Sequence, residues 1–172
     1  MTDKATDPRE ALVYEATEIG RWVGCRPSLV RRWLRSTLSG QRGSPASFLN
    51  LIDLLFAQPF LSCGLRFKHL RAALDEAGCL LGINHFALHD FFTDGHGIFL
   101  RTHIYGNAIL RLLSDGQWIP VDQVLTISNN IDFDEVTGLA ERWYPHGRNG
   151  LIVIDPFTVG GRPSIDSRCV ST

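Results

Sequence analysis

The sequence predicts an α+β fold, with an N-terminal winged helix-turn-helix that is all-α apart from a small wing, followed by a small, mostly β module. Residues 12–82 carry apolar side chains at helical spacing, and from residue 83 Gly-rich turns separate short β-branched and aromatic runs. With 172 residues and 44% hydrophobic content, the chain can bury a substantial core. Residues 1–11 are polar and contain proline, so we expect a mobile arm with order starting near Leu12.

The first two expected elements are short helices over residues 15–23 and 27–36, separated by the sequence Gly-Cys-Arg-Pro. Pro27 suits the first position of a helix because its missing N–H would have no helical partner there. In the second helix the apolar residues are spaced i, i+3, i+4 and predict one buried stripe, Val30, Trp33 and Leu34. The opposite face then presents Ser28, Arg31, Arg32 and Arg35.

The next segment, "TLSGQRGSP", has glycines and a proline around Arg42 and predicts the wing. The run "SFLNLIDLLFA" predicts a helix whose apolar surface over residues 48–56 is broader than one short helix needs, so we expect part of it to face a second subunit in a homodimer. Pro59 is expected to interrupt or kink this helix. A further amphipathic helix is expected over residues 66–80, so that residues 12–82 hold the winged helix-turn-helix and its dimerisation helices.

We expect residues 83–150 to form the β-rich module. "FFTDGHGIFL" is typical of a hairpin, and "IDFDEVTGLAERWY" predicts a second one that turns near residues 135–138. "GLIVID", residues 150–155, predicts a buried strand. Residues 151–172 form a C-terminal segment.

Positive charge is concentrated in the second helix. The net charge of the chain is only -1, yet no acidic residue lies between Glu18 and Asp53, a window that holds six arginines. A solvated surface normally mixes both signs. Arginine can bind guanine O6 and N7 with two hydrogen bonds, and a serine at a helix start can bind a phosphate. The predicted DNA-binding residues are Ser28, Arg31, Arg32, Arg35 and Arg42; the alternatives are a basic helix that only meets solvent and one that meets an acidic protein.

Two stretches resemble known families. "YEATEIGRWVGCRPSLVRRWLRS", with the Gly-rich segment and "FLNLIDLLFA" after it, is similar to the MerR-like winged helix-turn-helix. The chain departs from that pattern at Arg26, where the family has a Ser or Thr that caps the helix. "IDPFTVGGRPSIDSRCVST" resembles the Gly-Arg-Pro-x-Ile pattern that opens a small domain of unknown function attached to VapB-type antitoxins, which implies that residues 151–172 are the start of that domain. The order of these segments is similar to that of a VapB-type antitoxin subfamily.

The resemblance implies an antitoxin that neutralises a PIN-domain ribonuclease toxin and represses its own operon by binding double-stranded operator DNA. PIN nucleases hold metal with carboxylates, and an antitoxin arginine can pair with such a cluster. By charge alone, Arg162 and Arg168 are the candidates for binding the toxin, although Gly160-Gly161-Arg162-Pro163 is equally typical of a rigid turn with a solvated arginine. The alternative function is a MerR-like regulator whose β half senses a small ligand, with no toxin partner.

Enzymatic and metal-binding functions have less support. His85 and His89 are four residues apart, with Cys79, His96 and His103 nearby, but the intervening residues look like core and we predict no metal site. The acidic residues Asp90, Asp94, Asp132 and Asp134 mostly fall in predicted turns, where Asp is favoured for hydrogen bonding to the backbone. No catalytic triad or phosphate loop is found, so we expect no enzyme and no cofactor. Unpaired cysteines and the lack of an apolar leader or membrane span predict a cytoplasmic protein.

Overall fold

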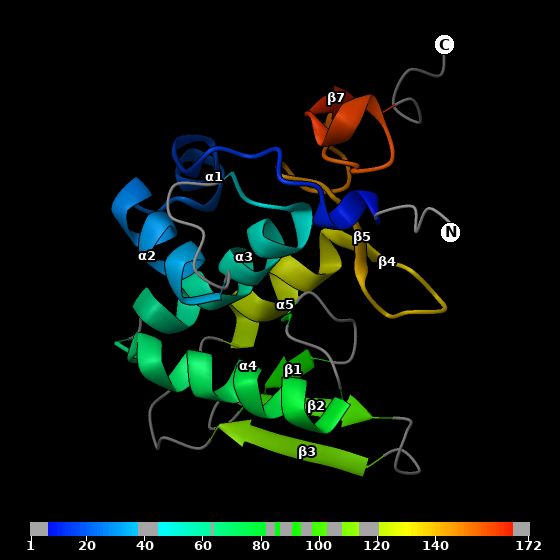
Figure 1. The fold of residues 1–172 in the computed structure, drawn as a ribbon. Helices are drawn as coiled ribbons and strands as arrows, with labels where there is room; N and C mark the ends of the chain where they lie inside the picture. The colour runs from blue at the N-terminus through cyan, green and yellow to red at the C-terminus, as the bar shows by residue number, and fades with distance from the viewer. Residues whose placement is uncertain are drawn as a thin grey trace, which may run out of the picture.

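The structure is a computed structural model, and it describes residues 7–37, 45–62, 64–81, 85–86, 91–93, 98–102, 108–113 and 121–166. Along the described residues a run of helices is followed by small antiparallel sheets with one further α-helix between them, which confirms the expected mixture of α and β structure (Figure 1). The buried side chains form one hydrophobic cluster that draws on both halves of the chain, from Tyr14 to Ile154. The two halves therefore share a core.

Secondary structure begins earlier in the chain than the sequence indicated. Pro8–Glu10 form a short 3-10 helix, η1, and the Arg9 side chain is buried. Its guanidinium pairs with Asp7 at 2.7 Å and donates to Thr137 Oγ1 at 3.3 Å. The expectation of a mobile arm up to residue 11 is thus wrong for residues 7–11, because the buried Arg9 ties them to Thr137 in the second half of the chain.

Helices α1 (Ala16–Val23) and α2 (Pro27–Thr37) pack against each other at the predicted positions. A reciprocal pair of hydrogen bonds between Glu15 and Glu18 caps the start of α1. At the end of α1, Gly24 adopts a left-handed conformation (φ 74°) that reverses the chain toward α2. The predicted stripe of α2 is buried, since Val30 and Trp33 are 0% exposed and Leu34 is 5% exposed.

Helix α3 (Phe48–Ser62) lies at the centre of the molecule (Figure 1). Ser47 starts it, because its hydroxyl accepts from Asn50 N while Asn50 Oδ1 accepts from Ser47 N, both at 3.2 Å. Every residue from 48 to 57 is buried within this single chain, and the helix continues through Pro59 to Ser62. The apolar surface that predicted a dimer is therefore covered by the protein itself, and the dimerisation argument built on residues 48–56 is wrong.

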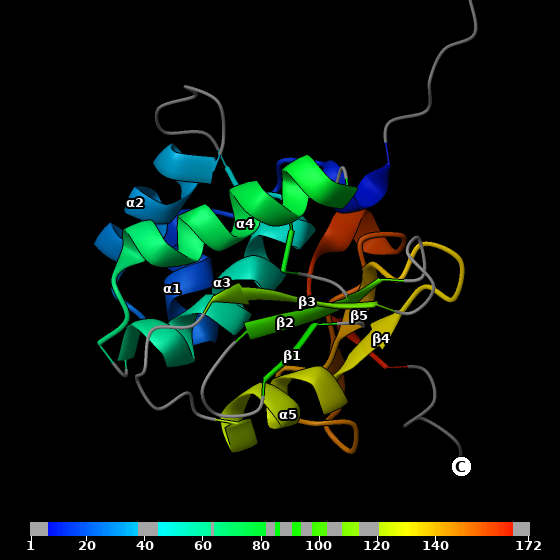
Figure 2. The same ribbon diagram turned by 90° about the horizontal axis from the view of Figure 1, so that it is seen from below.

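Helix α4 (Phe67–Leu81) matches its prediction, with Leu70 and Leu74 buried. It packs beside a three-stranded antiparallel sheet of order β1 (Phe91–Thr93), β2 (Ile98–Thr102), β3 (Ala108–Leu113). The first two strands pair as the predicted hairpin, with Phe92 opposite Phe99. Figure 2 shows α4 on the β3 side of this sheet and helix α5 on the β1 side, in agreement with the contacts between these elements.

Helix α5 (Val121–Asn129) was not expected from the sequence, although most of the other described elements of the second half are strands. It packs on α3, and its Val124 is 4% exposed. The following hairpin, β4 (Ile131–Phe133) and β5 (Ala140–Trp143), turns where the sequence predicted. Asp134 stabilises the turn by accepting from the backbone N–H groups of Val136 and Thr137, which fits the interpretation of this Asp as a turn residue.

The C-terminal segment folds back onto the start of the chain. Strand β6 (Ile152–Val153) pairs with β7 (Ser164–Ile165), and the 3-10 helix η2 (Val159–Gly161) lies between them. The predicted buried strand at 150–155 is shorter and only partly buried, because Leu151 is 60% exposed whereas Ile154 is fully buried. The buried Tyr14 hydroxyl donates to the Gly161 carbonyl at 2.6 Å, which joins two segments at opposite ends of the chain.

Candidate functional site

The outward face of α2 is the first part of the candidate site. Ser28, Arg31, Arg32 and Arg35 are all exposed, opposite the buried stripe of the same helix. The structure thus brings four of the five predicted DNA-binding residues to one surface. Arg42, with the whole predicted wing at residues 38–44, lies outside the described residues, so the winged form of the helix-turn-helix stays a prediction.

The turn before α2 fixes how this helix lies against α1. The Cys25 backbone N–H donates to the Gly20 carbonyl at 2.9 Å. A Cβ atom at Gly20 would lie 2.8 Å from the Cys25 carbonyl oxygen and 3.3 Å from Pro27 N, so only glycine lets the two backbones approach this closely. Arg26 cannot cap α2 with its side chain, but its carbonyl accepts from Leu29 N and Val30 N, so the N–H of the third helical residue has a backbone partner.

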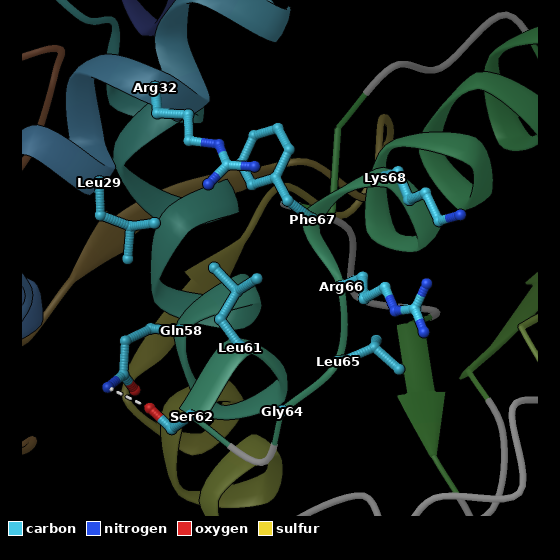
Figure 3. Close-up of a pocket in the computed structure, with 10 residues that line it drawn as sticks. All are labelled: Leu29, Arg32, Gln58, Leu61, Ser62, Gly64, Leu65, Arg66, Phe67 and Lys68. Atoms are coloured by element: carbon cyan, nitrogen blue, oxygen red, sulfur yellow. Dashed lines mark hydrogen bonds between the residues drawn. The ribbon is translucent and has the colours of Figure 1, made fainter.

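A pocket of about 740 Å³ adjoins α2 and forms the second part of the site (Figure 3). We call it the basic pocket, because its described lining includes three cations, Arg32, Arg66 and Lys68, and no carboxylate. The other lining residues are Leu29, Gln58, Leu61, Ser62, Gly64, Leu65 and Phe67. They come from α2, from the end of α3, and from the start of α4 with the turn before it, so the pocket is where these three helices meet.

Arg32 belongs to both parts of the site. Its guanidinium lies over the Phe67 ring, 5.2 Å from the ring centre, and Figure 3 shows it across the mouth of the pocket from Leu61. Phe67 in turn meets the buried Trp33 edge to face, with the ring centres 5.1 Å apart. This stacking restricts Arg32, because a cation over an aromatic face is stabilised by roughly 0.5–1 kcal/mol at an exposed site.

Arg66 and Lys68 were not among the residues predicted from the sequence. They are exposed at the start of α4, a helix without an acidic residue in its first turn. The signal was present in "GLRFKHL", which places two cations either side of an aromatic residue, but its position next to α2 depends on the tertiary fold. The combined surface offers cations and an aromatic ring with no competing carboxylate among its described residues, which suits a polyanion.

The predicted toxin-binding residues lie elsewhere. Arg162 is exposed just after η2, in a tight turn where Gly160 and Gly161 both have positive φ. The Gly161 carbonyl is held by Tyr14, so Arg162 extends from a fixed backbone. Arg168 lies outside the described residues. Arg162 does not line the basic pocket.

His85, which the sequence offered as a possible metal ligand, has a different partner. Its Nδ1 lies 2.7 Å from Oδ2 of Asp53, a buried residue of α3 that also accepts from the Phe86 backbone N–H at 2.6 Å. Burial lowers the pKa of His85, but the charge and hydrogen bond of Asp53 outweigh that effect and raise it above the ordinary value. Within the described ranges no three His, Cys, Asp or Glu side chains are grouped as a metal site; His89, His96 and His103 fall outside them.

Comparison with known proteins supports the fold alone. No protein-family model matches the chain, and no curated protein matches it significantly. A solved structure, that of Rv2018 from Mycobacterium tuberculosis, is similar with a TM-score of 0.63 and 20% sequence identity, over 94% of this chain and 82% of that one. Among the helices described, none has the length and apolar character needed to cross a membrane.

Proposed function

We propose that this chain binds double-stranded DNA through α2 and acts as the antitoxin and autorepressor of a toxin–antitoxin pair. The observation that carries the DNA-binding part is the outward face of α2, where Arg31, Arg32 and Arg35 are exposed on a helix whose other face is locked in the core. A buried stripe holds the helix rigidly, and the outer residues can enter a major groove about 12 Å wide.

The described residues of α1 and α2 carry almost no acidic side chains. Across the described residues of α1 and α2 the only carboxylate is Glu18, in the first turn of α1, and its side chain already accepts the Glu15 backbone N–H. The arginines of α2 therefore have no acidic neighbour on their own helix to compete with phosphate. Such a surface binds nucleic acid with an affinity that falls as salt rises.

The antitoxin part of the proposal has its support in the sequence resemblance, and the geometry adds one feature. The Gly-Arg-Pro turn displays Arg162 on a backbone tied to Tyr14, and Arg162 is not part of the lining of the basic pocket. A partner could therefore engage Arg162 while α2 remains available to DNA. A cytoplasmic location and a homodimer on a palindromic operator belong to the same proposal, and the dimer surface has to lie outside residues 48–56.

Fluorescence anisotropy tests the DNA-binding part. The purified protein is titrated into labelled DNA from upstream of its own gene and into a scrambled duplex, with Arg31→Ala/Arg35→Ala and the control Arg162→Ala alongside. We expect specific binding that the double variant loses, at about 1–3 kcal/mol for each arginine that reads a base, and no effect of the control. Equal, weak binding of both duplexes by all three proteins would refute it.

Co-purification tests the antitoxin part. The product of the neighbouring gene is co-expressed with the chain, and the complex is isolated through a tag on that product. We expect co-elution that Arg162→Glu weakens, because a glutamate would repel a carboxylate cluster. Absence of a complex with the unaltered chain would refute the toxin partner and leave the DNA-binding part standing. Light scattering on the same samples reports the oligomeric state.

A further inference from the structure

The cations of α2 continue without interruption into the basic pocket. Arg66 and Lys68, from the start of α4, line the same cavity as Arg32. The first carboxylate along α4 is Asp75, seven residues beyond Lys68 and so about 10 Å further along the helix. That carboxylate already pairs with Arg71 at 2.8 Å. The described residues of α2, of the pocket lining and of the first two turns of α4 therefore include no acidic side chain.

The arginines of α2 divide into two groups. Arg32 lines the pocket and is held over Phe67, whereas Arg31 and Arg35 are exposed on α2 and do not line the pocket. A base-reading arginine needs freedom to bring its planar fork to a base edge, but a phosphate contact needs only a charge at a fixed place. The stacked Arg32 suits the second task.

The chemistry of the pocket also favours a backbone over a base. Its lining offers three cations, while the neutral polar side chains at its edge, Gln58 and Ser62, are already hydrogen bonded to each other at 3.0 Å. A phosphodiester carries negative charge and presents only acceptors. Three cationic donors match it without any acceptor from the protein.

We propose that the basic pocket holds the phosphate backbone of the same nucleic acid that α2 reads, with Arg32, Arg66 and Lys68 as phosphate contacts and Arg31 and Arg35 as base contacts. This inference rests on the proposed DNA-binding function and assigns α4 a part in it. It predicts two sets of residues whose removal has different consequences, one for affinity at any sequence and the other for discrimination.

The salt dependence of binding separates the two sets. Arg66→Ala/Lys68→Ala should weaken binding to operator and scrambled duplexes by the same factor and lower the slope of log K against log salt by about 2, because each phosphate that a cation neutralises adds about 0.9 to that slope. Arg31→Ala/Arg35→Ala should instead reduce the ratio between the two affinities. Arg162→Ala, an exposed arginine outside the pocket lining, is the control for removal of a charge. Circular dichroism confirms that each variant is folded.

The binding measurements distinguish failure of the proposed role of the pocket from failure of the proposed DNA-binding function. If the α2 variant loses discrimination while Arg66→Ala/Lys68→Ala keeps both affinity and slope, the DNA-binding function stands and the role of the pocket is overturned. If neither duplex binds to the unaltered protein, both proposals fail. A second arm adds phenyl phosphate at constant ionic strength: saturable binding that needs Arg66 and Lys68 but leaves DNA affinity unchanged would assign the pocket to a free small anion and overturn the inference.

Discussion

Removing the Tyr14 hydroxyl tests how the C-terminal segment is held. Tyr14→Phe keeps the ring, including its edge-on contact with Trp22, but removes the hydrogen bond to the Gly161 carbonyl. Tyr14 is 2% exposed, so water cannot easily replace the missing donor. Leaving a buried carbonyl without a partner costs about 1–3 kcal/mol, and we expect the free energy of unfolding to fall by that amount.

Gly161→Ala approaches the same contact from the other side. Gly161 has φ 77°, a conformation that costs an alanine about 1–2 kcal/mol, and the added Cβ would lie 2.6 Å from the Tyr14 hydroxyl oxygen. The substitution must therefore also displace that hydroxyl, and we expect a total loss of about 2–5 kcal/mol. In the Tyr14→Phe background the nearest remaining atom is the ring carbon at 3.4 Å, so only the conformational cost is left.

The effects of Tyr14→Phe and Gly161→Ala on the free energy of unfolding should therefore be non-additive. Urea unfolding of both single variants and the double variant, followed by circular dichroism, gives the coupling, which we expect to be about 1–3 kcal/mol. Gly160→Ala is the matched control, because Gly160 also has a positive φ of 61° but faces open space, so its cost should add to that of Tyr14→Phe. Additivity of the Gly161 variant within about 0.5 kcal/mol would refute the reasoning.

Three further outcomes follow from local geometry. The pKa of His85 is raised in the folded protein, so its pairing with Asp53 stabilises the protein fully below the unfolded pKa. That stabilisation disappears as pH rises through the folded pKa. Urea unfolding across pH 5.5–8.5 should show this fall in the free energy of unfolding for the unaltered chain and not for His85→Gln. Gly24→Ala should cost about 1–2 kcal/mol without a steric clash, because φ is 74° and nothing lies near; an unchanged melting temperature would contradict this. Val159 is a β-branched residue at φ 48° and 68% exposed, so Val159→Asn should raise the free energy of unfolding by about 0.5–1 kcal/mol, and lower stability in urea would show that the conformation is not strained.

Elements specified by their own residues were predictable from the sequence. The α1–α2 pair follows from local spacing, because Gly24 ends one helix and Pro27 begins the next. The β4–β5 hairpin follows likewise from its turn, which Asp134 holds through its own near neighbours. In both cases the determining contacts lie within a few residues.

Features that depend on distant segments were missed. The apolar circumference of α3 predicts a subunit interface when only the sequence is considered. The sequence does not show that α5 and Phe86 of the same chain cover this helix. The helix α5 itself contains Val, Ile and Thr, which favour strands, and its packing on α3 outweighs that preference. For the same reason the sequence predicted the arginines of α2 but not Arg66 and Lys68, which reach the site only when α4 packs beside α2.

The central position of α3 also has a consequence during translation of the protein. A ribosome completes α3 at Ser62 but reaches the end of α5 only at Asn129. At about 5–20 residues per second, that interval leaves the most apolar helix of the chain without its final cover for roughly 3–13 seconds. During this time the nascent chain exposes a surface of the kind that chaperones bind, so we expect its yield in the cell to depend on how fast the second half is translated.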